Sequence, residues 1–172
     1  MSARILVVLA CLLSPIAAGA TSSKDIKIGV HVIDFVTNPP AGKTAIGVLY
    51  DSKIKESADD AQVILEALSA SLPHGAAAPK PILVDIRDLD DAQTLRAVVV
   101  ADHMKPHFDK VSAFGHRTGA LILSTDLECV RSNKCTVGIA SSPRVEVILS
   151  SKQAQASGIQ FSEAFRMMVT EY

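Results

Sequence analysis

The feature that most constrains the fold is a set of short apolar runs that alternate with segments of helical spacing. The runs are AIGVLY at 45–50, PILVDI at 81–86, AVVVAD at 97–102 and GALILST at 119–125. Strands with apolar residues at consecutive positions are buried on both faces of a sheet. We therefore expect an α/β fold: a three-layer, open, mostly parallel sheet with helices on both faces.

Three segments between these runs have the features of helices. SKIKESADDAQVILEALSASL, at 52–72, has apolar residues at helical spacing, and Ser57 is its expected N-cap. LDDAQTL, at 89–95, predicts a short helix. MKPHFDKVSAFGHRTG, at 104–119, predicts a helix with Pro106 near its start and a glycine at its end.

The pattern changes in the C-terminal third of the chain. CTVGIA at 135–140 and RVEVILS at 144–150 predict an antiparallel hairpin at the edge of the sheet. The segment after it, 151–172, predicts two short helices that break at Gly158. Its FRMMV stretch could pack a terminal helix onto the core or form an exposed docking surface. Residues 24–36 fit either a strand or a helix, and their β-branched content favours a strand.

The first 20 residues have the pattern of a secretory signal peptide. Arg4 precedes an apolar stretch, and Ala18-Gly19-Ala20 provides a small-residue cleavage motif. We expect cleavage there, which leaves one mature domain, 21–172, in the periplasm; an uncleaved anchor is the alternative. The loss of Arg4 leaves 16 basic and 18 acidic side chains, with no basic cluster, so nothing indicates a nucleic-acid partner.

Cys129 and Cys135 are the two cysteines of the expected mature chain. An exported, oxidising compartment favours a disulfide between them. Their spacing differs from that of a thioredoxin-like redox motif, and two cysteines without a partner pair do not make a zinc site. A disulfide that closes a short loop, worth about 2 kcal/mol, is the expected role.

Polar residues follow the apolar runs where the parallel strands should end. Asp51, Asp102 and Asp126 each lie at or just beyond such an end, which is the edge where open α/β sheets bind ligands. A helix start nearby could offer a hydroxyl and backbone donors to an anion. The candidate ligand-binding residues are Asp51, Ser52, Ser57, Asp102, Thr125 and Asp126. Ordinary loop and helix-cap chemistry remains an alternative for all of them.

His103 and His107 are four residues apart in HMKPH and would share one face of a helix. They could bind copper or zinc, although two ligands do not close a site, and a solvated helix start is the alternative. NPPAGKT, at 38–44, lacks the first glycine of a phosphate loop, and no G-x-S-x-G motif is present. We therefore expect no enzymatic activity and no cofactor.

With these elements placed, the chain resembles the periplasmic YfiR-like family. The likeness is carried by DFVTNPPAGKTAIGVLYD, LVDIRDLDDAQTLRAVVVAD, GALILSTDLECV and RVEVILSSKQAQASGIQFSEAFRMMV. It implies a small, non-enzymatic, dimeric regulator with an intramolecular disulfide, which holds an inner-membrane diguanylate cyclase inactive from the periplasm. It also implies that residues 24–36 form a helix. The chain departs from the family in having TNPP in place of Trp-Pro and in lacking a second cysteine pair.

IGVLYDSKIKESADDAQ, at 46–62, is also similar to one lobe of the periplasmic substrate-binding proteins of ABC transporters. There, the loop after a strand and the start of a helix hold the ligand. We expect a sensor or regulatory protein that binds an envelope partner, such as a cyclase or a transporter component, and responds to a small ligand. The alternative is a small-ligand or metal-binding protein that serves a transporter.

Overall fold

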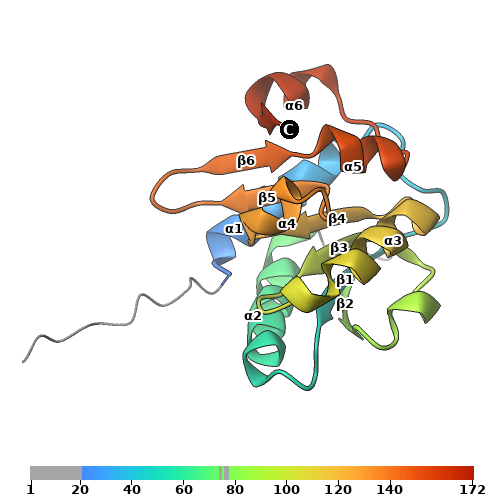
Figure 1. The fold of residues 1–172 in the computed structure, drawn as a ribbon, viewed down its shortest axis with the longest axis vertical. Coiled ribbons are helices and arrows are strands. Elements are labelled where there is room, and N and C mark those ends of the chain that lie inside the picture. The colour runs from blue at the N-terminus through green and yellow to red at the C-terminus, as the bar shows by residue number, and fades with distance from the viewer. Residues whose placement is uncertain (1–20, 74, 76–77) are drawn as a thin grey trace, which may run out of the picture.

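The computed structural model describes residues 21–73, 75 and 78–172, so the expected signal peptide, 1–20, lies outside the described residues. In this part of the chain, seven strands form one sheet in the order β2-β1-β3-β4-β5-β6-β7 (Figure 1). The strands are β1 (Ala45–Tyr50), β2 (Lys80–Asp85), β3 (Leu95–Val100), β4 (Leu121–Ser124), β5 (Val137–Ala140), β6 (Glu146–Leu149) and β7 (Thr170–Glu171).

Strand direction confirms the predicted open, mostly parallel sheet. Strands β1 to β5 are parallel, and β5 pairs with β6 in the predicted antiparallel hairpin. The two-residue strand β7 adds to β6 as the outermost strand, which the sequence did not predict. The order β2-β1-β3 means that the chain reverses its direction of travel across the sheet beside β1, the switch point of a doubly wound fold.

Helices cover both faces of the sheet, as predicted. They are α1 (Ser23–Asp34), α2 (Lys55–Ser71), α3 (Phe108–Thr118), α4 (Leu127–Arg131), α5 (Ser151–Ala156) and α6 (Glu163–Met168), with 3-10 turns η1 (Leu89–Asp91) and η2 (Lys105–His107). α1 and α2 pack on one face, and α3 and α4 on the other (Figure 1). Val98 and Val99 accordingly belong to two different apolar clusters, because successive strand residues point to opposite faces.

The N-terminal segment is a helix, so the strand favoured by its β-branched residues is wrong and the helix implied by the family resemblance is correct. A capping box starts α1: Ser22 Oγ accepts from the Asp25 N–H, and the Asp25 carboxylate accepts from the Ser22 N–H. Ile26 and Ile33 are seven residues apart, so they lie on the same face of the helix, and both are buried in the core. Packing of this face outweighs the small helix propensity lost by branched residues.

Two further local predictions need correction. Helix α2 begins at Lys55 with Ile54 as its N-cap, so Ser57 lies inside the first turn and is wholly buried. The cysteine segment contains the short helix α4, which we did not predict. By contrast, Gly119 ends α3 in the left-handed conformation (φ 70°), and Gly158 (φ 67°) separates the last two helices as expected. No helix of the described part is both long and apolar enough to cross a membrane.

Candidate functional site

The carboxyl ends of β1, β2 and β3 meet at one edge of the sheet. Asp51 follows β1, Asp85 ends β2, and Asp102 lies two residues beyond β3. The first two are 7% exposed. Because β1 and β3 flank the switch point, the fold brings these acidic residues to the edge where doubly wound sheets bind ligands.

Asp51 is held by its own loop and by η2. Its Oδ1 accepts from the Lys53 N–H at 2.9 Å, and its Oδ2 lies 2.9 Å from His107 Nε2. The Lys53 amide and then the His107 contact lower the pKa of the Asp51 carboxyl. Ser57 Oγ accepts from the Asp51 N–H at 3.2 Å. Two of the candidate ligand-binding residues, Asp51 and Ser57, are thus in contact, but their polar groups form hydrogen bonds within the protein.

Asp85 and Arg87 form an ion pair that the sequence analysis missed. Arg87 Nε and Nη2 lie 2.8 and 2.9 Å from the two carboxylate oxygens, a bidentate arrangement. Arg87 Nη2 also donates to Ser52 Oγ at 2.7 Å, and the Ser52 N–H donates to Asp85 Oδ2 at 3.3 Å. The pKa of Asp85 lies far below its usual range, chiefly because of the hydrogen bonds from Arg87. The Asp-x-Arg spacing directly after an apolar run was the available signal.

Two further candidates, Asp102 and Thr125, lie around Asp60, a buried residue of α2. Asp60 Oδ1 accepts from the Thr21 N–H at 3.0 Å, and its Oδ2 accepts from the Thr21 hydroxyl at 3.0 Å and the Asp102 N–H at 2.8 Å. Thr21 Oγ1 also lies 3.1 Å from Thr125 Oγ1. We call these four residues the Asp60 cluster. Burial, followed by the charge of Asp60, raises the pKa of Asp102.

Asp126 has a local role in the structure, which is helix capping. It is the N-cap of α4, and its Oδ1 accepts from the Glu128 N–H at 2.9 Å. It follows β4, so it lies at the same edge of the sheet as Asp102. The structure therefore assigns one oxygen of Asp126 to helix capping.

The two histidines do not share a helix face, so that prediction is wrong. His103 adopts a left-handed conformation (φ 62°) before η2 begins, and His107 is the last residue of that 3-10 turn. Only His107 belongs to the helical turn, so the four-residue spacing does not place both side chains on one helix. Within the described residues, no group of three or more His, Cys, Asp or Glu side chains could hold a metal ion.

An open groove of about 560 Å³ lies on the C-terminal segment. Leu149, which lines it, pairs with Val137 at the start of β5, so the groove lies at the amino ends of the parallel strands, opposite the Asp60 cluster. The other lining residues are Thr37, Ser151, Ala154, Gln155, Gly158, Ile159, Gln160, Phe161 and Arg166. All of these residues except Thr37 lie within 149–166, and the groove depends on how β6, α5 and α6 fold against one another, which the sequence pattern does not show.

Helix α6 beside the groove combines a buried anchor with exposed apolar side chains. Phe165 is 2% exposed and stacks on Phe35 and Phe161, with ring centroids 5.3 and 4.8 Å apart. Met167 and Met168 are 77% and 66% exposed. The FRMMV stretch therefore both packs onto the core and leaves apolar surface free.

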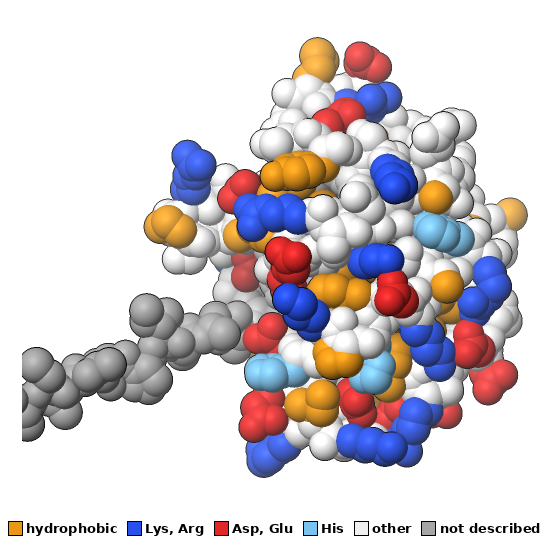
Figure 2. Space-filling view, in the orientation of Figure 1, with side chains coloured by type: hydrophobic (Ala, Val, Ile, Leu, Met, Phe, Trp, Pro, Cys, Tyr) orange, Lys and Arg blue, Asp and Glu red, His pale blue; other side chains and the backbone are white. Residues whose placement is uncertain are grey.

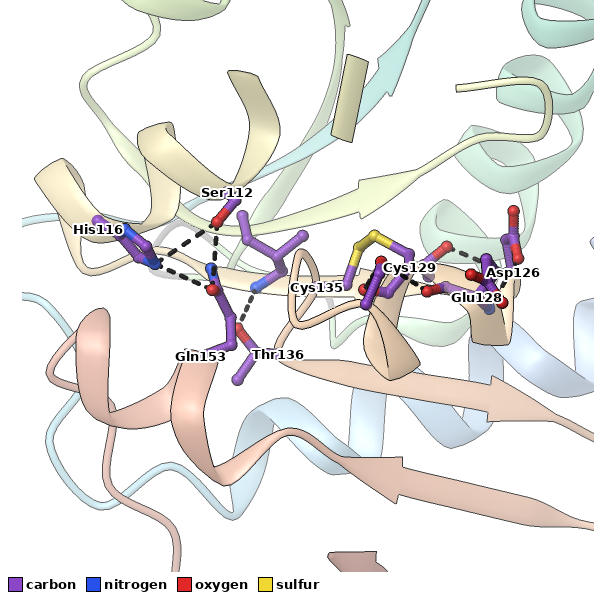
Figure 3. The surroundings of a disulfide bond; sticks show 11 residues. Ser112, His116, Asp126, Glu128, Cys129, Cys135, Thr136 and Gln153 are labelled. Atoms are coloured by element: carbon purple, nitrogen blue, oxygen red, sulfur yellow. Dashed lines mark hydrogen bonds between the residues drawn. A yellow bond between two sulfur atoms is a disulfide. The ribbon is translucent and has the colours of Figure 1, made fainter. Parts of the chain in front are cut away.

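The predicted disulfide joins Cys129 of α4 to Cys135, and both residues are wholly buried (Figure 3). Figure 3 also shows the polar contact that joins α3 to α5 near the disulfide. Gln153 Oε1 accepts from the Ser112 hydroxyl at 3.2 Å and lies 2.9 Å from His116 Nε2. These contacts fix the start of the C-terminal segment against α3.

Charge on the face drawn in Figure 2 is mixed, with acidic and basic side chains interspersed over the surface. A large surface with positive charge alone attracts nucleic acid or anionic membrane surfaces. This face carries no such surface.

Comparison with known proteins gives a fold and no family: neither the known family models nor the curated proteins contain a match. Among solved structures, an ABC domain in complex with L-Trp from Streptococcus pneumoniae is 14% identical, with a TM-score of 0.61 over 86% of this chain and 60% of that chain. A conserved domain protein from Vibrio cholerae is 12% identical, with a TM-score of 0.62 over 85% of this chain and 59% of that chain.

A third similar structure is the ligand-free, open form of a substrate-binding protein with adhesive properties from Clostridium difficile. It is 9% identical, with a TM-score of 0.63 over 88% of this chain and 59% of that chain. The chain thus spans about 60% of the length of the structures it matches. At these identities the likeness establishes the fold alone, which is an α/β fold found in substrate-binding proteins.

Proposed function

We propose that the mature protein is a non-catalytic regulatory domain of the bacterial envelope, which binds a protein partner through its C-terminal segment. The observation that carries this proposal is the 560 Å³ groove next to exposed methionines on α6. The resemblance to the YfiR-like family supports the regulatory role, since it implies a protein that acts on an inner-membrane partner from the periplasm. The partner would be an inner-membrane protein such as a diguanylate cyclase, or a component of a transporter.

The chemistry of the surface specifies what the partner should present. Methionine side chains are flexible and polarisable, so they adapt to partners of varied shape, and large exposed apolar side chains that lie together mark interaction sites. Gln155 and Gln160 lie in the lining of the groove, whereas Arg166 Nε and Nη2 already donate to the two carboxylate oxygens of Glu171. A partner segment with apolar side chains and carbonyl groups would match this combination.

Crosslinking in envelope fractions tests the proposal. Replacing both exposed methionines (Met167→Glu, Met168→Glu) should abolish the crosslinked partner and leave the melting temperature nearly unchanged, because both side chains are largely exposed. Val63→Glu is the matched control, since Val63 is an apolar residue of α2 that is 45% exposed, and it should retain the partner. A wild-type protein without any crosslinked partner, or a double variant that keeps it, would refute the proposal.

A second candidate function is the binding of a small polar ligand at the carboxyl edge. It is favoured by the switch-point position of Asp51 and Asp102 and by a fold found in substrate-binding proteins, one similar domain being solved with L-Trp. Carboxylates suit a ligand with an ammonium group. A thermal-shift screen of amino acids should then give stabilisation of about 2.7 kcal/mol at 100 times Kd, abolished by Asp51→Asn and retained by Asp59→Asn. A screen without any shift would remove this candidate.

A further inference from the structure

We propose that processing of the precursor after Ala20 creates a buried ion pair, between the new α-ammonium group of Thr21 and the carboxylate of Asp60. The pair would form at the carboxyl edge of the sheet, between the first residue of the mature chain and α2. The inference is independent of the groove and of the partner proposed above.

The geometry of the pair is already present around the Thr21 nitrogen. This nitrogen lies 3.0 Å from Asp60 Oδ1, and the Thr21 hydroxyl lies 3.0 Å from Asp60 Oδ2. Thr21 is 4% exposed and Asp60 is 6% exposed. A charge formed on this nitrogen would therefore arise in direct contact with the carboxylate of a buried residue.

Processing changes the chemistry of that nitrogen. Hydrolysis of the Ala20–Thr21 bond adds a water molecule: the hydroxyl group goes to the Ala20 carbonyl carbon, and a hydrogen goes to the Thr21 nitrogen. The resulting amine takes one more proton from solvent at neutral pH. An amide with a single hydrogen thus becomes an ammonium group with three, and its bond to Asp60 becomes charge-assisted on both sides.

In the described part of the chain, His103 lies close enough to Asp102 for its charge to act on that carboxyl, but Asp60 itself has no ion-pair partner. Among the described residues, no Lys, Arg or His side chain lies within ion-pair distance of Asp60 or Asp102. The Asp102 N–H donates to Asp60, but it brings a second carboxylate to the same place. A buried carboxylate without a counter-charge is costly, and an ammonium group at Thr21 would offset that cost.

The pair would also fix the N-terminal segment to three other elements. Thr21 reaches α2 through Asp60 and the end of β4 through Thr125. The next residue, Ser22, caps α1 and lies 3.2 Å from the Ser141 hydroxyl that follows β5. A precursor with a neutral Thr21 amide would therefore hold α1 less firmly than the processed protein.

The first test compares the processed protein, which begins at Thr21, with the same protein that retains Ala20 as its first residue. The extension moves the ammonium group by one residue and leaves all the side chains in place. We expect the melting temperature of the extended form to be lower by about 3–8 °C, the range for loss of a charge-assisted bond in a domain of this size. Equal melting temperatures would overturn the proposal.

Substitution of the carboxylate completes the comparison. Asp60→Asn should lower the melting temperature of the processed form more than that of the extended form, because only the former loses an ion pair. Asp59→Asn is the matched control: its side chain is 64% exposed, and the change should be small and equal in both forms. An Asp60→Asn effect of the same size in both forms would overturn the pairing.

Amine labelling keeps the proposal testable if Asp60→Asn does not fold. In the native processed protein, acylation of the Thr21 α-amine should be at least about tenfold slower than in urea, because the group is buried and paired. Equal rates would contradict the pairing. Mass spectrometry of the exported protein must also identify Thr21 as its first residue, and a different first residue would overturn the role of processing.

Discussion

At the scale of single residues, the acidic side chains at the carboxyl edge of the sheet form hydrogen bonds and ion pairs with other residues of the protein. Arg87 and the Ser52 N–H contact Asp85, while His107 lies against Asp51. The positions of Asp51 and Asp102 could be predicted because each follows an apolar run. Their partners could not be predicted, because they depend on which strands and helices become neighbours in space.

Replacing Arg87 with Gln should raise the pH midpoint of acid unfolding. Arg87 lowers the pKa of Asp85 in the folded state, so the pair stabilises the fold above the unfolded pKa of about 3.9. This contribution falls as the pH drops through the lower folded pKa. The difference in unfolding free energy between wild type and Arg87→Gln should therefore be largest above about pH 4 and decrease below it.

Circular dichroism across an acid titration measures this difference. Arg144→Gln is the control, since Arg144 is exposed and belongs to no ion pair of the described chain. It should leave the acid midpoint unchanged. An Arg87→Gln variant with the wild-type midpoint would show that the pair adds nothing to stability.

At the scale of elements, the buried strands and the long helix α2 could be predicted from periodicity. Helix α1 could not be predicted from its residues alone, because Ile and Val favour strands locally while their spacing suits one buried helical face. Helix α4 has only five residues, which is too short for a periodic signal. Its Asp126 cap and the disulfide at Cys129 stabilise it in the folded protein.

Removal of the disulfide should destabilise the protein without changing its fold. Replacing Cys129 and Cys135 with Ala should cost about 2 kcal/mol in urea unfolding, because the unfolded chain loses the constraint of a short closed loop. Thiol labelling of the native wild-type protein should give no signal, and labelling after reduction in urea should modify both residues. Two reactive thiols in the native protein would contradict the buried disulfide.

At the scale of the whole molecule, contacts between the two ends of the chain close the groove. The segment after α1 reaches the loop before α6: the Thr37 N–H donates to the Gln160 carbonyl, and the Ser162 N–H donates to the Phe35 carbonyl. The stacking of Phe35 and Phe161 on Phe165 buries the same junction. Sequence periodicity describes only residues close together in the chain, so it cannot reveal a junction between segments more than 100 residues apart.

Truncation of Phe165 should loosen this junction. Phe165→Ala should cost about 3–5 kcal/mol, the usual cost of deleting a buried aromatic side chain. It should also increase hydrogen exchange of the backbone amides in α6. Met167→Ala, on the same helix but exposed, should change the stability by less than about 0.5 kcal/mol. Equal effects of the two substitutions would show that Phe165 does not anchor the helix.

The depth of the disulfide sets an order of events during maturation. Thiol–disulfide exchange requires an attacking thiolate to reach the sulfur atoms. In the finished fold both cysteines are wholly buried among core residues such as Val130 and Ile148. An oxidising enzyme must therefore act while this part of the chain is still open. Once α4 has packed against the sheet, the same burial protects the bond from reductants.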